Sequence, residues 1–202
     1  MRVLVACEFS GIVRDAFAKR GHDAWSCDLL PTEKPGNHIQ DDVLKHLDEG
    51  WDLMIAHPPC TYLTCAGNKW FGPKYRLRFP NREAQMKEGA SFFMRFTQTK
   101  IPKVAIENPI GRMSSLFRKP DQIIQPFQFG HDARKATALW LFGLSKLRGT
   151  NLVPVTIHTT KSGNTMSMWH IKCGRAGNQK ERAHLRSITF QGIADAMAEQ
   201  WG

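Results

Sequence analysis

The sequence lacks the features of membrane-embedded and secreted proteins. No apolar run approaches the roughly 20 residues that span a bilayer, and the opening segment Arg2 to Ala6 is typical of a β-strand rather than a signal peptide. The five cysteines are odd in number and show no disulfide-like spacing, which favours a reducing compartment. We therefore expect a cytoplasmic protein that binds no membrane.

Internal repeats, low-complexity segments and a clear metal-ligand pattern are missing as well. His170, Cys173 and His184 could suggest zinc, but their spacing fits no common structural site and a fourth ligand is not evident. The sequence therefore predicts neither a repeat protein nor a metal centre.

Charge is distributed unevenly along the chain. The 202 residues carry a net charge of +10, but residues 1–60 hold 6 Lys/Arg against 10 Asp/Glu, and residues 61–202 hold 22 against 8. An acidic first part suits a cofactor-binding half, and the basic remainder suits a surface that faces nucleic acid. A soluble basic surface without a partner is the alternative. With 42% hydrophobic residues the chain can bury one core, so we expect a single domain spanning residues 1–202.

Short apolar runs alternate with helical patterns. This alternation predicts an α/β protein with a parallel, doubly wound sheet. The expected strands are 2–7, 23–27, 51–56, 103–107, 137–142 and 152–158, and the expected helices are 12–20, 82–97 and 189–201. Residues 61–80 are rich in glycine, proline, aromatic and basic residues, so we expect a loop there.

Two of these strands lead into residues with catalytic chemistry. Cys60 follows the apolar run that ends at Ala56, and Glu107 ends the run that begins at Val104. Open α/β folds place their active sites at the carboxyl edge of the sheet, so a thiol nucleophile and an acid could meet there. The plainer alternatives are a buried structural cysteine and a salt-bridged or helix-capping glutamate.

The first strand leads into a turn that could hold a nucleotide-type cofactor. Gly11 lies between a strand and a helix, where a glycine lets the backbone approach a ligand. Asp28 ends the second strand, at the position where nucleotide-binding folds contact ribose hydroxyls. An ordinary turn aspartate is the alternative.

Together, these motifs resemble those of the cytosine-C5 DNA methyltransferases. The motif order is kept, the Pro-Pro-Cys and Glu-Asn-Pro motifs are the more specific ones, and the segment 190–201 resembles the family's closing helix. The resemblance implies a Rossmann-like, S-adenosylmethionine-dependent methyltransferase, a small phage-type member acting in a bacterial or phage-infected cell. The implied cofactor-binding residues are Phe9, Ser10, Gly11, Asp28, Asp41, Asp42 and Pro58, and the implied catalytic residues are Pro59, Cys60, Glu107, Asn108 and Arg134.

Three departures from the family pattern have consequences. Val13 and Arg14 stand where the family usually has further glycines, which affects how the cofactor's amino-acid end would bind. Arg134 stands roughly in the place of an arginine in an otherwise incomplete Gln-x-Arg-x-Arg motif. The short segment 144–185 stands where other members carry a large target recognition domain, so it would be a minimal recognition segment.

The resemblance also implies a mechanism. Cys60, as a thiolate, would add to C6 of cytosine, while Glu107 would contact N3 and the exocyclic amine. Asn108 would fix the loop at Pro59 or Glu107 itself, and Arg134 could neutralise charge at O2. In double-stranded DNA, which is the expected partner, the target base would first be flipped out of the stack.

Several alternatives stay open at this point. The same chemistry could act on tRNA, or the fold could belong to a catalytically silent nucleic-acid-binding or decoy protein. A cysteine-dependent hydrolase with His57 as the base is a third possibility. The loop 61–80 could close on nucleic acid through its basic and aromatic side chains, or its aromatic rings could pack together. The sequence does not predict the oligomeric state.

Overall fold

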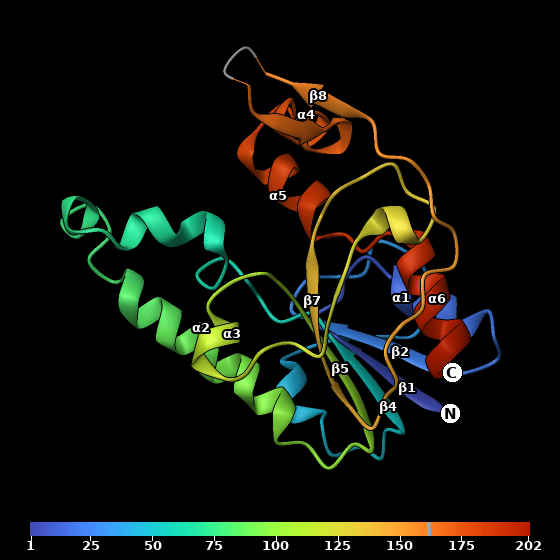
Figure 1. Cartoon of the computed structure of the whole chain (residues 1–202). Coiled ribbons are helices and arrows are strands. Elements are labelled where there is room, and N and C mark those ends of the chain that lie inside the picture. The colour runs from blue at the N-terminus through green and yellow to red at the C-terminus, as the bar shows by residue number, and fades with distance from the viewer. Residues whose placement is uncertain (161–162) are drawn as a thin grey trace.

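The protein is built around one mixed seven-stranded sheet (Figure 1). The computed structural model describes residues 1–160 and 163–202, so Lys161, a basic residue of the segment 144–185, lies outside the described residues. The strands lie in the order β3-β2-β1-β4-β5-β7-β6. Their bounds are β1 (Arg2–Ala6), β2 (Asp23–Asp28), β3 (His38–Gln40), β4 (Leu53–Ala56), β5 (Lys103–Pro109), β6 (Gln122–Ile124) and β7 (Thr137–Phe142).

Five neighbouring strands, from β3 to β5, run parallel. The residues of β4, and all but the first of β1, are apolar and buried, as expected for central strands of a sheet covered on both faces. In the register, Ala6 pairs with Ala56, and Ala56 pairs with Ile106. The residues that follow these strands therefore emerge side by side at the carboxyl edge, where the sequence predicts the active site.

β7 is antiparallel to both of its neighbours, so the prediction of an all-parallel sheet is wrong at this end. The connection from β6 to β7 holds only the 3₁₀ turn η4 (Pro126–Gln128), whereas parallel neighbours need a crossover, usually through an α-helix. This strand order, with an antiparallel β7 beside β5, is typical of the S-adenosylmethionine-dependent methyltransferase fold. The predicted fold class is confirmed.

Helices cover both faces of the sheet (Figure 1). On one face α1 and α6 pack together, and Phe17 and Met197 lie in their shared core. On the other face α2 contributes Phe93 and Phe96 to a second core. The helices are α1 (Ile12–Ala18), α2 (Arg82–Thr97), α3 (Met113–Leu116), α4 (Met168–Gly174), α5 (Gln179–Ser187) and α6 (Gln191–Trp201).

A small region between β7 and α6 extends beyond the edge of the sheet (Figure 1). It contains the hairpin of β8 (Ile157–Thr159) and β9 (Thr165–Ser167), followed by α4 and α5. The predicted strand 152–158 is wrong for most of its length, because only its last two residues join a ladder. α5 buries no side chain, so this strongly polar helix contributes nothing to the core.

All five cysteines are free. Within residues 1–160 and 163–202, no helix has the length and apolar character needed to cross a membrane. In the same part of the chain, no three or more His, Cys, Asp or Glu side chains are grouped so that they could hold a metal ion, and His170, Cys173 and His184 do not form a ligand set.

Candidate active site

The two motifs with catalytic chemistry emerge from adjacent parallel strands. Cys60 lies four residues beyond β4 and is partly buried, while Glu107 lies near the end of β5 with 19% of its side chain exposed. Between Cys60 and the strand, Pro58 is buried and Pro59 is exposed. The neighbouring strands thus bring a thiol and a carboxyl group to the same edge of the sheet.

Asn108 ties the two motifs together. Its amide Nδ2 donates a hydrogen bond of 2.9 Å to the carbonyl oxygen of Pro58, and the side chain is almost fully buried. This contact spans 50 residues of sequence and holds the loop that presents Cys60. It agrees with the first of the two roles that the resemblance implies for Asn108.

The chain segments beyond Cys60 and Asn108 also cross each other closely. Thr64 and Gly111 form an antiparallel bridge, and the amide of Arg112 donates to the carbonyl oxygen of Leu63 at 2.7 Å. A Cβ atom on Gly111 would collide with that same carbonyl oxygen. Only glycine permits this crossing, which fixes the loop around Cys60 against the end of β5.

Glu107 contacts His57, the residue that the sequence offers as the base of a cysteine-dependent hydrolase. The Nδ1 atom of His57 lies 3.4 Å from Oε2 of Glu107. Burial alone would raise the pKa of Glu107, but the hydrogen bond with His57 and the positive charge of Lys135 outweigh it, so the pKa lies below its usual value. The other ring nitrogen of His57, Nε2, is buried and has no hydrogen-bond partner among the described residues, so it makes no hydrogen bond to Cys60. This disfavours a hydrolase in which His57 activates Cys60.

Cys60 is surrounded by opposing charges. Burial raises the pKa of its thiol, and the negative charge of Glu107 raises it further. The positive charges of Lys135, just before β7, and of Arg186, near the end of α5, act in the opposite direction. The pKa of the Cys60 thiol lies above its usual value, because burial and Glu107 outweigh the two cations. Lys135 and Arg186 partly offset this rise and so help to form the thiolate that nucleophilic attack requires.

Arg134 occupies a different position from these two cations. Its side chain is exposed, and its backbone amide donates to the hydroxyl of Ser167 at 3.4 Å. Lys135, the next residue, is partly buried and acts on both Cys60 and Glu107. The incomplete Gln-x-Arg-x-Arg motif predicts a role for Arg134. Lys135 and Arg186 belong to no motif that would predict a role for them.

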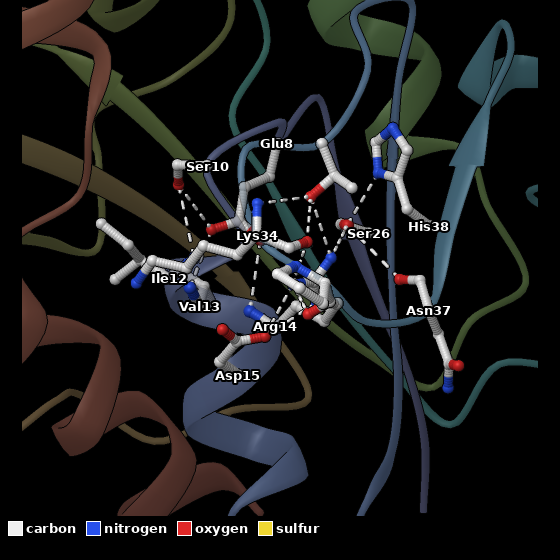
Figure 2. Close-up of polar contacts among 12 residues, drawn as sticks. Glu8, Ser10, Ile12, Val13, Arg14, Asp15, Ser26, Lys34, Asn37 and His38 are labelled. Carbon is white, nitrogen blue, oxygen red and sulfur yellow. Dashed lines mark hydrogen bonds and ion pairs between the residues drawn. The ribbon is translucent and has the colours of Figure 1, made fainter.

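The turn between β1 and α1 is closed by an internal carboxylate (Figure 2). Glu8 is buried and accepts hydrogen bonds from the amides of Val13 at 2.7 Å and Arg14 at 3.2 Å. The hydroxyl of Ser10 adds a third bond to Glu8 at 3.2 Å. Gly11 has a φ of 71°, the left-handed conformation that glycine adopts readily, and α1 begins directly after it. These first amides of α1 are therefore already paired.

The departures Val13 and Arg14 have structural roles. Val13 is part of the core, and the Arg14 side chain is only 1% exposed. Its guanidinium donates to the hydroxyls of Ser26 and Thr32 and to the carbonyl oxygens of Lys34 and Pro35, as Figure 2 shows in part. Arg14 thus anchors the loop after β2 on the first helix.

The residues near Asp28 fit the adenosine portion of S-adenosylmethionine. Oδ1 of Asp28 accepts a hydrogen bond from the amide of Leu30 at 2.9 Å, as in an ordinary turn, and the residue is only partly buried. Leu29 and Leu30 beside it are 72% and 53% exposed. A carboxylate with apolar neighbours suits a ribose and an adenine ring. At the amino-acid end, the helix amides paired with Glu8 are not open to the cofactor's carboxylate.

Asp41 and Asp42 have local partners, whereas Phe9 contacts a residue far away in the sequence. Asp42 accepts from the amide of Leu44 at 3.0 Å and caps the 3₁₀ turn η1 (Val43–Lys45). A short contact with Lys45 lowers the pKa of Asp41 to about 2. The ring of Phe9 lies 5.7 Å from that of His184 in α5, so the small region touches the turn after β1.

No protein-family model matches the sequence, and no curated protein matches it with significance. Among solved structures, one match is a candidate DNA modification methyltransferase encoded within a prophage of E. coli, with 13% identity and a TM-score of 0.48. That match covers 77% of this chain and 53% of the other, so the chain spans about half the length of that protein. A similarity this low supports no conclusion on activity, and the fold assignment rests on the strand order.

Proposed function

We propose that this protein is an S-adenosylmethionine-dependent methyltransferase that acts on C5 of cytosine in DNA. The observation that carries the proposal is the meeting of Cys60 and Glu107 at one sheet edge, held by the hydrogen bond from Asn108 to Pro58. A thiol and a carboxyl group in this relation suit the attack on C6 and the contact with N3 that C5 methylation needs.

The residues divide the chemistry among them. Cys60 attacks C6 as a thiolate, favoured by Lys135 and Arg186. Glu107 binds N3 and the exocyclic amine, which holds the ring while negative charge develops on it. Lys135 would neutralise that charge, a role that the resemblance implies for Arg134. C5 would then take the methyl group, and loss of the C5 proton to water with β-elimination would release Cys60.

The cofactor would lie along the edge from β1 to β3. Asp28 would accept from the ribose hydroxyls, and Asp41 and Asp42, which follow β3, would lie near the adenine ring. When bound, S-adenosylmethionine supplies an electrophilic methyl group. The turn that holds Phe9, Ser10 and Gly11 would pass beside its amino-acid end, and the buried Pro58, which follows β4, would lie near the same edge of the sheet.

Two basic regions rise on different sides of the sheet edge and suit a nucleic acid (Figure 1). One contains the 3₁₀ turns η2 (Cys65–Phe71) and η3 (Pro73–Tyr75), and the other contains α4 and α5. In the first, the Trp70 ring packs edge-on against Tyr75 and Phe79, with centroids 4.8 and 5.4 Å apart. The aromatic rings therefore pack together. Lys74 and Arg78 lie over the rings of Tyr75 and Phe79, and with Arg76 they are exposed and could contact phosphates.

Methyl transfer with product identification tests the proposal. The protein is incubated with radiolabelled S-adenosylmethionine and either duplex DNA or tRNA, and the nucleosides are then separated. We expect label in 5-methylcytosine from DNA. Label in tRNA alone would show that the substrate is tRNA and not DNA. Label in a base other than cytosine would contradict methylation at C5 of cytosine. No label in either nucleic acid would favour a catalytically silent binding protein.

The Asp28→Ala variant should bind S-adenosylmethionine more weakly by about 1.5–3 kcal/mol, the value of a hydrogen bond to a charged group. Isothermal calorimetry measures this change. Asp48→Ala is the matched control, because Asp48 is exposed and lies in the turn after η1. Its neighbour Glu49 contacts Arg2, which pairs with the start of β2, at the opposite end of that strand from Asp28. An unchanged affinity in Asp28→Ala would remove Asp28 from the site, and no binding by the wild type would favour the decoy function.

The segment 144–185 predicts relaxed sequence specificity with a steep dependence on salt. It is short and basic, and phosphate contacts position a protein without reading the bases. Bisulfite sequencing of host DNA should therefore show methylation at a short sequence of a few base pairs, and a single long, strict motif would contradict this. Its basic residues are Lys146, Arg148, Lys161, Lys172, Arg175, Lys180 and Arg182, against Glu181 alone.

A further inference from the structure

We propose that His57 is a positioning residue that delivers a proton to Glu107, which passes it to N3 of the cytosine as Cys60 adds to C6. This inference rests on the proposed function and assigns a role that the sequence alone did not give to His57. The structure offers three observations in its support: the strand register, the contact geometry and the charges around the pair.

The register of the sheet brings His57 and Glu107 together. Ala56 at the end of β4 pairs with Ile106 in β5, so the next residues along the two parallel strands are His57 and Glu107. Their side chains are 12% and 19% exposed, and Nδ1 lies 3.4 Å from Oε2. The pair is thus built into the sheet and does not depend on a surface loop.

The His57 ring is held through Glu107. Its Nε2 atom is buried, and among the described residues it has no hydrogen-bond partner. Nδ1 therefore makes the polar contact that orients the ring, and a proton on Nδ1 points at the carboxylate. This contact places Nδ1 where it can pass a proton to Glu107.

The chemistry requires such a proton. When the thiolate forms the bond to C6, the C5–C6 π electrons move into the ring and N3 takes a proton. Glu107 has a pKa below its usual value, because the contact with His57 and the charge of Lys135 outweigh the effect of burial. It is therefore a carboxylate at neutral pH and cannot donate unless a neighbour supplies the proton.

The proton can move without any further reactant. It passes from Nδ1 of His57 to Oε2 of Glu107 and from that carboxyl group to N3, which leaves His57 neutral and Glu107 ionised. On β-elimination the C5 proton leaves to water, the bond between sulfur and C6 breaks, and the N3 proton returns by the same route. Electrons and protons balance over the cycle.

Other groups near the pair also influence its titration. Lys135 and the hydroxyl of Thr137, from the strand on the other side of β5, both favour the ionised form of Glu107. Cys60 must lose its own proton, and its titration is influenced by Glu107, Lys135 and Arg186. The resulting rise in rate with pH is common to all the variants below, so it does not obscure the effect of His57.

Two substitutions separate proton delivery from mere packing. His57→Asn keeps an N–H group near the position of Nδ1 but does not titrate, and His57→Leu removes the contact. Exchange of the C5 hydrogen of cytosine in DNA, measured without cofactor between pH 5.5 and 9, reports the addition step directly. Affinity for DNA and the melting temperature are measured beside it.

We expect His57→Asn to keep its fold and DNA affinity but to exchange the C5 hydrogen about 100-fold more slowly near neutral pH, within the usual range for proton transfer. The decline of its rate with rising pH should begin at lower pH, because Glu107 alone then holds the proton. A pH profile identical to that of the wild type would overturn the proposal, as would a loss confined to DNA affinity or stability.

A direct titration distinguishes this inference from the proposed function. In protein labelled with ¹³C at the glutamate carboxyls, the Glu107 signal is assigned with Glu107→Gln. Replacing His57 by leucine should raise the pKa of Glu107, and an unchanged value would overturn the inference even if the enzyme is active. The wild type could instead show neither exchange nor methyl transfer while the pKa of Glu107 still rises in His57→Leu. The pair of His57 and Glu107 would then exist, and the proposed function would be wrong.

Discussion

The Cys60→Ala variant is expected to lose methyl transfer to DNA by roughly a thousandfold or more, the scale seen when a covalent nucleophile is removed. Its fold and cofactor affinity should remain close to those of the wild type. Cys60 is only partly buried and lies beyond the end of β4, so removing its sulfur leaves no large cavity in the core. Cys60→Ser should lose activity in the same way.

Cys65→Ala is the matched control for this experiment. Cys65 is also free but is exposed, and it lies five residues further along the same loop. Transfer is measured with labelled S-adenosylmethionine, and the fold is checked by circular dichroism. Full activity in Cys60→Ala, or an equal loss in Cys65→Ala, would contradict covalent catalysis by Cys60.

The Gly111→Ala variant is expected to lose both stability and activity. A Cβ atom at this position would overlap the carbonyl oxygen of Leu63, a backbone group that cannot simply rotate away. Forcing the two segments apart should cost roughly 1–3 kcal/mol of unfolding free energy. A shift of about 1 Å between Cys60 and Glu107 should also reduce the rate about a hundredfold.

Gly89→Ala gives the opposite expectation and serves as the control. Gly89 lies inside α2, where an added Cβ would meet Leu63 side-chain atoms at 3.7 Å or more, which is ordinary contact. Alanine in a helix interior is more stable than glycine by roughly 0.5–1 kcal/mol. Urea denaturation of both variants measures the difference. Wild-type stability and activity in Gly111→Ala would show that the crossing does not hold the site.

The central part of the fold could be predicted because β4 is fully apolar and β1 is apolar after Arg2. β1 is followed by Gly11 and a helical pattern, and β4 is followed by two prolines. The positions of these strands and their shared edge therefore follow from the sequence. Once that edge is known, Cys60 and Glu107 are expected to approach each other. The buried face of α6, with Ile193 and Met197, also followed from its periodicity.

The remaining parts depended on contacts that no local pattern reveals. The strands β3 and β6 have three residues each, too few for a period of two to be recognised. The direction of β7 is set by a short connection, and α5 has no buried face. His57 and Lys135 acquire their roles from the strand register and from charges on other elements. Arg14 stands where the resembling family has a glycine, and in the structure its side chain is buried and anchors the loop after β2.

Covalent trapping on DNA that contains 5-fluorocytosine tests the central claim most directly. Fluorine at C5 blocks the elimination, so an enzyme that attacks C6 stays bound to its substrate. With S-adenosylmethionine present, we expect one adduct that survives denaturation, and digestion with mass spectrometry should place it on the peptide that contains Cys60. No adduct, or an adduct that still forms in Cys60→Ala, would contradict the proposed mechanism.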